Sequence, residues 1–131
     1  MFRELLDRTL SEIDADERAG PLLRATGLRV RFRFPDLELA LSVAPSEQGG
    51  HHLRWTFSED AEWEPRVELS MSSQVANGYL QGRESLAIAI ARGRVSYRGD
   101  TRCALHYLPA MRVVVDAYSR LVREVHPELV I

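Results

Sequence analysis

Acidic side chains crowd one short stretch of the chain and are the first candidates for chemistry. They are Glu59, Asp60, Glu62 and Glu64, and they surround Trp63. A pair of carboxylates catalyses glycoside hydrolysis only when both groups are fixed about a pocket at a set separation. This stretch lies between two predicted strands and is typical of a solvated loop, so we assign it no catalytic role.

Histidines and the single cysteine are the next candidates for chemistry. His51 and His52 are adjacent at the start of a predicted strand, where neighbouring side chains point to opposite faces, so they are poorly placed to share a metal ion. His106 and His126 stand alone and suit helix-end or surface positions. Cys103 has no second cysteine with which to form an internal disulfide or a zinc site, and its place in a short amphipathic helix favours a buried thiol.

The chain also lacks the short sequence motifs that are typical of common enzyme classes. It has no nucleophile elbow, no phosphate-binding loop, no dinucleotide fingerprint and no zinc-protease motif. We therefore predict that this protein is not an enzyme and that it uses no cofactor and no metal ion.

Bulk composition narrows the class of protein. The 131 residues are 45% hydrophobic and 27% charged, which is typical of a globular protein, and they form one predicted domain, residues 1–131. The formal net charge of -2 argues against a nucleic-acid partner. There is no apolar run of about 18 residues and the amino terminus does not resemble a signal peptide, so we expect a cytoplasmic protein.

Strict alternation of apolar and polar residues predicts the first two strands, 28–34 and 37–43. Pro35 and Asp36 would form the turn between them, although proline does not favour a tight hairpin turn and a looser turn is the alternative. Pairing Phe34 with Leu37 places every apolar side chain on one face of the sheet. Further strands at 53–57 and 67–71 extend this hairpin into a predicted antiparallel meander of four strands.

Helical periodicity predicts helices before and after the four strands of the meander. An amphipathic helix is predicted over 2–14, followed by a loop at Gly20 and Pro21. Helices at 72–80 and 84–92 precede a fifth strand at 94–98, and a short helix at 101–107 precedes a longer one that begins at Pro109. We predict an α+β fold with a single, mainly antiparallel five-stranded sheet and helices covering its one apolar face. The helix at 84–92 is apolar almost all round, so we expect both of its sides to meet protein or ligand.

The segment that ends in Gly93-Arg94-Val95-Ser96-Tyr97-Arg98-Gly99-Asp100 resembles the sterol carrier protein-2 (SCP2) family. The likeness is strongest over 72–108 and extends more weakly to the first hairpin and the last helix. It implies a curved sheet whose helices enclose an apolar tunnel, in which fatty acyl chains, acyl-CoA or sterols bind without covalent chemistry. The implied tunnel wall comprises Met71, Val75, Tyr79, Leu80, Leu86, Ile88, Ala89 and Ile90, with Leu108, Met111, Val114 and Val115 as a lid.

The resemblance therefore predicts non-catalytic binding or transfer of an apolar ligand. The same inward-facing residues could instead pack solidly, because most protein interiors are filled. That alternative is a structural, interaction or dimerisation module that serves a lipid-metabolising enzyme. A surplus of arginines is also predicted on the polar sheet face, which is either solvated or a docking surface for a second copy, an acidic enzyme partner or an anionic membrane contacted transiently. These arginines are Arg29, Arg31, Arg33, Arg54, Arg66, Arg94 and Arg98.

Overall fold

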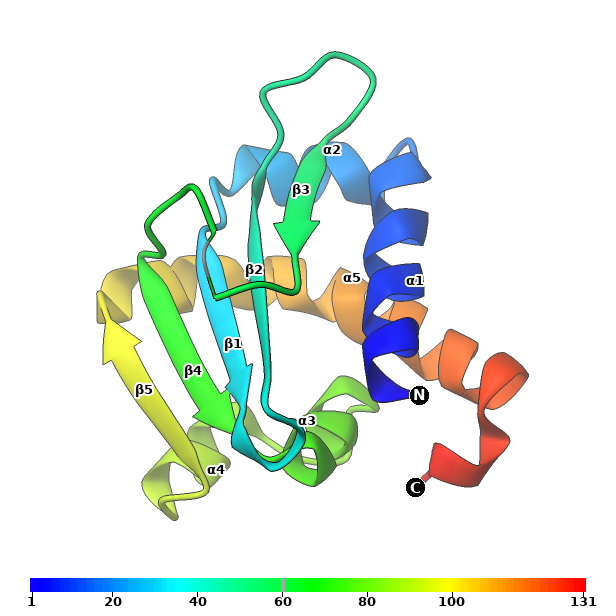
Figure 1. The fold of residues 1–131 in the computed structure, drawn as a ribbon, viewed down its shortest axis with the longest axis vertical. Coiled ribbons are helices and arrows are strands. Elements are labelled where there is room, and N and C mark those ends of the chain that lie inside the picture. Colours follow the sequence, from blue (N-terminus) through cyan, green and yellow to red (C-terminus); the bar gives the residue numbers. More distant parts are fainter. Residues whose placement is uncertain (60) are drawn as a thin grey trace.

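The computed structural model describes residues 1–59 and 61–131, and the side chains of residues 101, 103–106, 108 and 109 lie outside the description. The described residues form an α+β domain in which helices lie behind one sheet (Figure 1). The strands are β1 (Val30–Phe34), β2 (Leu39–Pro45), β3 (Leu53–Thr56), β4 (Val67–Met71) and β5 (Val95–Gly99). The helices are α1 (Phe2–Ala15), α2 (Ala19–Ala25), α3 (Ser73–Leu80), α4 (Leu86–Ala91) and α5 (Thr101–Val125).

The sheet is mixed, with strand order β3-β2-β1-β4-β5. β1 and β4 run parallel, while the other three neighbouring pairs run antiparallel. The predicted four-strand meander is therefore wrong, because β4 pairs with β1 instead of β3. The chain returns from β3 to β4 across the polar face of the sheet, where Glu59 forms an ion pair with Arg33 of β1.

The first hairpin keeps the predicted faces but shifts the register by two residues. Phe34 pairs with Leu39 and Phe32 with Leu41. The loop is longer than two residues because Pro35–Leu37 forms a 3-10 turn and Glu38 adopts a left-handed conformation with φ of 50°. A shift of two residues leaves every apolar side chain on its original face, since side chains alternate with a period of two.

Two helical predictions also need correction. Gly20 and Pro21 lie within α2 instead of a loop, because proline fits the first turn of a helix, where its missing N–H needs no partner. Asp16 starts this helix by accepting hydrogen bonds of 2.8 Å from the backbone N–H groups of Arg18 and Ala19. The separate helices predicted at 101–107 and from Pro109 onward are one continuous helix, α5.

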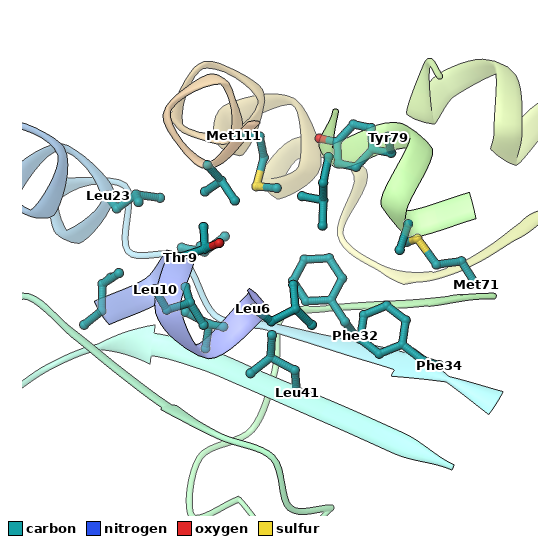
Figure 2. Close-up of a pocket in the computed structure, with 16 residues that line it drawn as sticks. Leu6, Thr9, Leu10, Leu23, Phe32, Phe34, Leu41, Met71, Tyr79 and Met111 are labelled. Atoms are coloured by element: carbon teal, nitrogen blue, oxygen red, sulfur yellow. The ribbon is translucent and has the colours of Figure 1, made fainter. Parts of the chain in front are cut away.

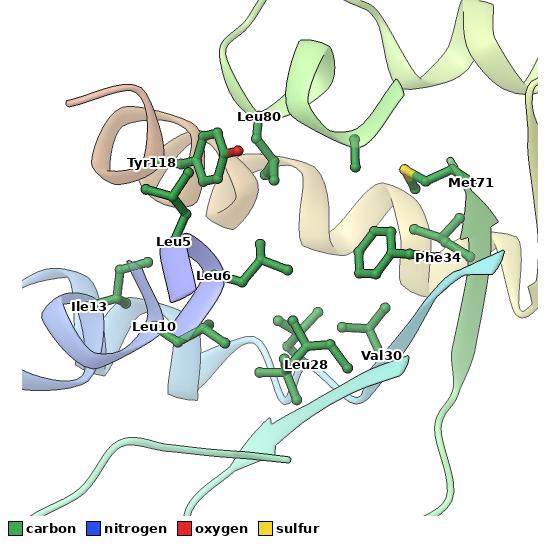
Figure 3. Packing of buried hydrophobic residues seen from close by; sticks show 14 of the residues in the cluster. Leu5, Leu6, Leu10, Ile13, Leu28, Val30, Phe34, Met71, Leu80 and Tyr118 are labelled. Atoms are coloured by element: carbon green, nitrogen blue, oxygen red, sulfur yellow. The ribbon is translucent and has the colours of Figure 1, made fainter. Parts of the chain in front are cut away.

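The hydrophobic core lies between the sheet and helices α1, α3 and α5 (Figure 3). Leu5 of α1 and Tyr118 and Leu121 of α5 are fully buried where the two helices meet. The ring of Phe2 meets Phe34 of β1 edge-on, with centroids 5.1 Å apart. Packing is thus dense where α1 crosses α5, and any internal space must lie elsewhere along α5.

Candidate ligand-binding site

Two internal cavities lie side by side between the sheet and the helices. The first has a volume of about 50 Å³ and the second about 60 Å³. Four side chains line both cavities, namely Leu28, Phe32, Tyr79 and Met111. These four residues therefore separate two halves of one apolar space.

The first cavity is bounded by α1, α2, α3, α5 and the sheet (Figure 2). Met111 reaches toward it from α5 and Leu6 from α1, while Phe32 and Phe34 rise from β1 in the same view. The residues that line only this cavity are Leu6, Thr9, Leu10, Leu23, Phe34, Leu41, Val43, Leu53, Met71, Ala76, Leu80 and Val114.

The second cavity extends the same space toward β4, β5 and α4. Its additional lining residues are Val30, Val67, Leu69, Leu86, Ile90, Tyr97 and Tyr107. Each cavity is smaller than the roughly 300–1,000 Å³ of typical small-molecule sites. A ligand longer than a few methylene groups thus requires the two halves to join.

The wall of the first cavity carries two hydroxyl groups. Thr9 donates its hydroxyl proton to the backbone oxygen of Leu5 over 2.6 Å, so its polarity is satisfied within α1. Tyr79 makes no side-chain hydrogen bond to any described residue, and burial raises the pKa of its phenol above 10.0. Tyr79 therefore remains protonated at neutral pH, and the surface that faces the cavity is apolar.

The residues implied by the resemblance fall into three groups in the structure. Met71, Tyr79, Leu80, Leu86, Ile90, Met111 and Val114 line one or both cavities. Val75 and Ile88 border an open groove on the outer surface, and Ala89 and Val115 line neither cavity. The side chain of Leu108 lies outside the described residues, as do those of Cys103 and His106.

Helix α4 differs most from its prediction. We expected both of its sides to meet protein or ligand, yet Ile88 is 51% exposed and Ile90 is 37% exposed. Only Ala89 of this helix is buried. The prediction is wrong because α4 stands at the edge of the molecule beside β5, where no other described helix covers its outer side (Figure 1).

Sequence reasoning did not assign helices α1 and α2 or strands β1 and β2 to the cavity wall. Leu6 and Leu10 of α1, together with Leu41 and Val43 of β2, contribute directly to it. The helical period of α1 and the alternation of β2 identify these residues as inward-facing. Neither pattern tells whether an inward side chain meets another side chain or an empty space.

Arginines on the polar sheet face contact groups of the same chain. Arg33 pairs with Glu68 through its Nε at 2.5 Å and with Glu59 at 2.8 Å. Arg31 donates a hydrogen bond of 3.1 Å to the hydroxyl of Ser42, and the guanidinium of Arg54 lies 4.4 Å from the ring centroid of Trp63. Much of the predicted surplus of positive charge on this face is therefore used within the fold.

The other candidates for chemistry do not form a site within the described part of the chain. His51 bonds to Asp14 of α1 over 2.8 Å, and His52 is not part of a metal-binding group. No cluster of three or more described histidine, cysteine or acidic residues could hold a metal ion. Glu62 and Glu64 are exposed, and Asp60 lies outside the described residues.

No family model and no curated protein sequence matches this chain. Solved structures do match in three dimensions. The sterol carrier protein 2 of Yarrowia lipolytica in its apo form aligns with a TM-score of 0.60 at 8% identity, over 86% of this chain and 88% of its own. The UbiJ-SCP2 ubiquinone synthesis protein aligns with a TM-score of 0.60 at 15% identity, over 80% of this chain and 88% of its own.

A larger protein contains a similar unit. The inverting sec-alkylsulfatase Pisa1 from Pseudomonas sp. aligns with a TM-score of 0.55 at 15% identity, and the match covers 76% of this chain. It spans only 14% of the sulfatase chain. Taken together, these structural matches show that the chain has the sterol carrier protein-2 fold, as its sequence resemblance predicted. Among the described helices, none has the length and apolar character needed to cross a membrane.

Proposed function

We propose that this protein binds an apolar small molecule, such as the acyl or alkyl chain of a lipid, without covalent chemistry. The observation that carries the proposal is the pair of adjoining apolar cavities, whose shared boundary comprises Leu28, Phe32, Tyr79 and Met111. An alkyl chain gains about 0.8 kcal/mol for each methylene group that it buries. A joined space between sheet and helices would therefore retain such a chain against water.

The boundary between the cavities is suited to rearrangement. Met111 has an unbranched side chain with three rotatable bonds, and such side chains adapt readily to irregular spaces. Both Met111 and Tyr79 are only half-buried, so they are not locked by packing on every side. Rotation of Met111 would join the two cavities into a channel that runs beneath α5.

Structural neighbours support the same class of ligand. The names of two of them refer to a sterol carrier and to ubiquinone synthesis, and both names concern apolar molecules. At 8% and 15% identity these neighbours support the fold, whereas the ligand of this chain is our proposal. We further propose that residues 1–131 act as one domain in the cytoplasm, where the protein carries or presents its ligand instead of transforming it.

The test places a larger side chain at each of two neighbouring positions of α5, of which only one lines the proposed site. Val114 lines the first cavity, whereas Val115 is equally a half-buried valine of α5 but lines neither cavity. We expect Val114→Phe to weaken binding of dansyl-labelled undecanoic acid at least tenfold and Val115→Phe to change it less than twofold. Equal binding by both variants, or no binding by the wild-type protein, would contradict this site.

A filled core is the second candidate, and the small volume of the cavities is the observation that favours it. Under this alternative the protein is an interaction or dimerisation module and retains no ligand. Native mass spectrometry of the purified protein separates the two functions. A mass increase from a co-purified lipid supports ligand binding, whereas a ligand-free protein that forms a stable homodimer supports the interaction module.

A further inference from the structure

Helix α4 presents an exposed apolar surface that neither cavity explains. Ile88 and Ile90 are 51% and 37% exposed, although isoleucine is among the residues most often buried. Ile131 is 57% exposed and lines the same surface groove as Ile88. Neighbouring exposed apolar side chains rimmed by polar groups are typical of an interaction surface.

Arginines surround this apolar surface. The groove beside Ile88 is lined by Arg83, Arg92 and Arg94 and by one acidic residue, Glu84. Arg94 is paired with Glu84, but the side chains of Arg83 and Arg92 form no hydrogen bond or ion pair with any described residue. The formal net charge of the chain is -2, so this groove is more positive than the molecule as a whole. Such an uneven charge distribution can orient the protein with this groove toward an anionic surface.

The same helix reaches the second cavity. Leu86 and Ile90 line that cavity, and the exposure of Ile90 places it between the interior and the surface. Figure 1 shows α4 at one end of the molecule, beside the edge strand β5 and away from the junction of α1 and α5. A projecting helix with apolar side chains and nearby arginines matches the layered chemistry of a bilayer, in which head groups overlie acyl chains.

We propose that the α4 surface, defined as Arg83, Ile88, Arg92 and Arg94, docks on an anionic lipid bilayer. Ile88 enters the boundary between head groups and acyl chains, and Arg83 and Arg92 contact the anionic head groups. This inference rests on the proposed function, because docking there places the helix that lines the second cavity against the source of its ligand. Each arginine contributes roughly a fivefold increase in binding to an anionic membrane.

Vesicle co-sedimentation tests the docking surface with matched variants. The vesicles consist of phosphatidylcholine alone or of two parts phosphatidylcholine and one part phosphatidylglycerol. We expect Arg83→Gln/Arg92→Gln to reduce binding to the anionic vesicles at least tenfold, whereas Arg18→Gln/Arg24→Gln, at two exposed positions of the α2 region, changes it less than twofold. We expect Ile88→Ser to reduce binding at least threefold, whereas Leu22→Ser, at a position 48% exposed, leaves it unchanged.

Three outcomes would overturn the docking proposal. One is equal loss of binding in the α4 and α2 variants, and another is equal binding to both vesicle types. The third is a concentration-dependent dimer that Ile88→Ser dissociates, which would assign the surface to a second copy of the chain. Binding of dansyl-labelled undecanoic acid without vesicles is measured in parallel, because Arg83→Gln/Arg92→Gln is expected to retain it. If the wild-type protein binds the fatty acid but not the anionic vesicles, only the docking proposal fails. If it binds the vesicles but not the fatty acid, only the proposed ligand site fails.

Discussion

The phenol of Tyr118 donates a hydrogen bond of 2.7 Å to Oδ1 of Asn77 and thereby joins α5 to α3 above the core. Asn77 also donates through Nδ2 to the backbone oxygen of Leu129, at 2.9 Å. Tyr118 is fully buried, and burial raises the pKa of its phenol well above 10.0, so the group remains a hydrogen-bond donor. One asparagine thus links two helices and the segment that follows α5.

Tyr118→Phe should lower the free energy of unfolding by about 1 kcal/mol, because one buried hydrogen bond is lost. The loss stays modest because Oδ1 of Asn77 keeps a second donor, Nε2 of Gln81, at 2.7 Å. Urea unfolding monitored by circular dichroism measures the change. Tyr97→Phe is the control, and its smaller effect follows from the exposure of the hydrogen bond to the backbone oxygen of Asp100. A larger loss for Tyr97→Phe would contradict the role assigned to Tyr118.

Met111→Ala should join the two cavities while destabilising the free protein. We expect a loss of about 2 kcal/mol, at the lower end for a methionine truncation because Met111 is half-buried. Dansyl-labelled undecanoic acid should then stabilise the variant more than it stabilises the wild type, since a larger space accepts more of the chain. Met71→Ala enlarges only the first cavity and is the control. Equal stabilisation of both variants by the probe would argue against a shared boundary at Met111.

Asp14→Asn should remove part of the acid sensitivity of the fold. Burial raises the pKa of Asp14, but hydrogen bonds from His51 and from the backbone N–H groups of Leu53 and His52 together lower it below 3.8. A carboxyl with a depressed folded-state pKa stabilises the fold above its unfolded pKa, and this contribution is lost as pH falls through the folded value. The wild type should therefore exceed the variant in stability at pH 7, and the difference should shrink below about pH 4.

Urea unfolding at a series of pH values measures this difference. Glu17→Gln is the control, because Glu17 is exposed and its side chain makes no hydrogen bond to a described residue. A stability difference between wild type and Asp14→Asn that stays constant from pH 7 to about pH 3 would rule out the linkage.

Gly99→Ala should be strongly destabilising, by at least about 2 kcal/mol, because the backbone conformation and the available space both oppose a side chain. Gly99 has φ of +121°, and an added Cβ would lie 2.1 Å from the backbone oxygen of Arg66. Gly93→Ala is the matched control: its φ is +74° but no atom lies within 4 Å of the added Cβ, so we expect a cost of about 1 kcal/mol. Thermal unfolding compares the two, and equal costs would show that the close approach to Arg66 is unimportant.

The glycine and aspartate of the Gly99-Asp100 phrase were recognisable in the sequence because their structural requirements are local. Gly99 has a positive φ of 121°, which favours glycine, and Asp100 caps α5 by accepting a hydrogen bond of 2.9 Å from the backbone N–H of Arg102. Likewise, the alternation in β1 and β2 predicted which side chains face the core. Such patterns depend on residues near one another in the chain, so the sequence alone reveals them.

Only the tertiary structure decided between arrangements that fit the local sequence pattern equally well. A hairpin shifted by two residues buries the same side chains, so alternation could not separate Phe34–Leu37 from Phe34–Leu39 pairing. The choice of β1 as the partner of β4, the exposure of α4 and the two cavities beside Phe32 and Met111 depend on how distant segments pack. The sequence by itself determined which side chains of β1, β2 and α1 face the core and that the fold resembles the sterol carrier protein-2 family. Only the packed structure determined which inward side chains meet one another and which meet a cavity.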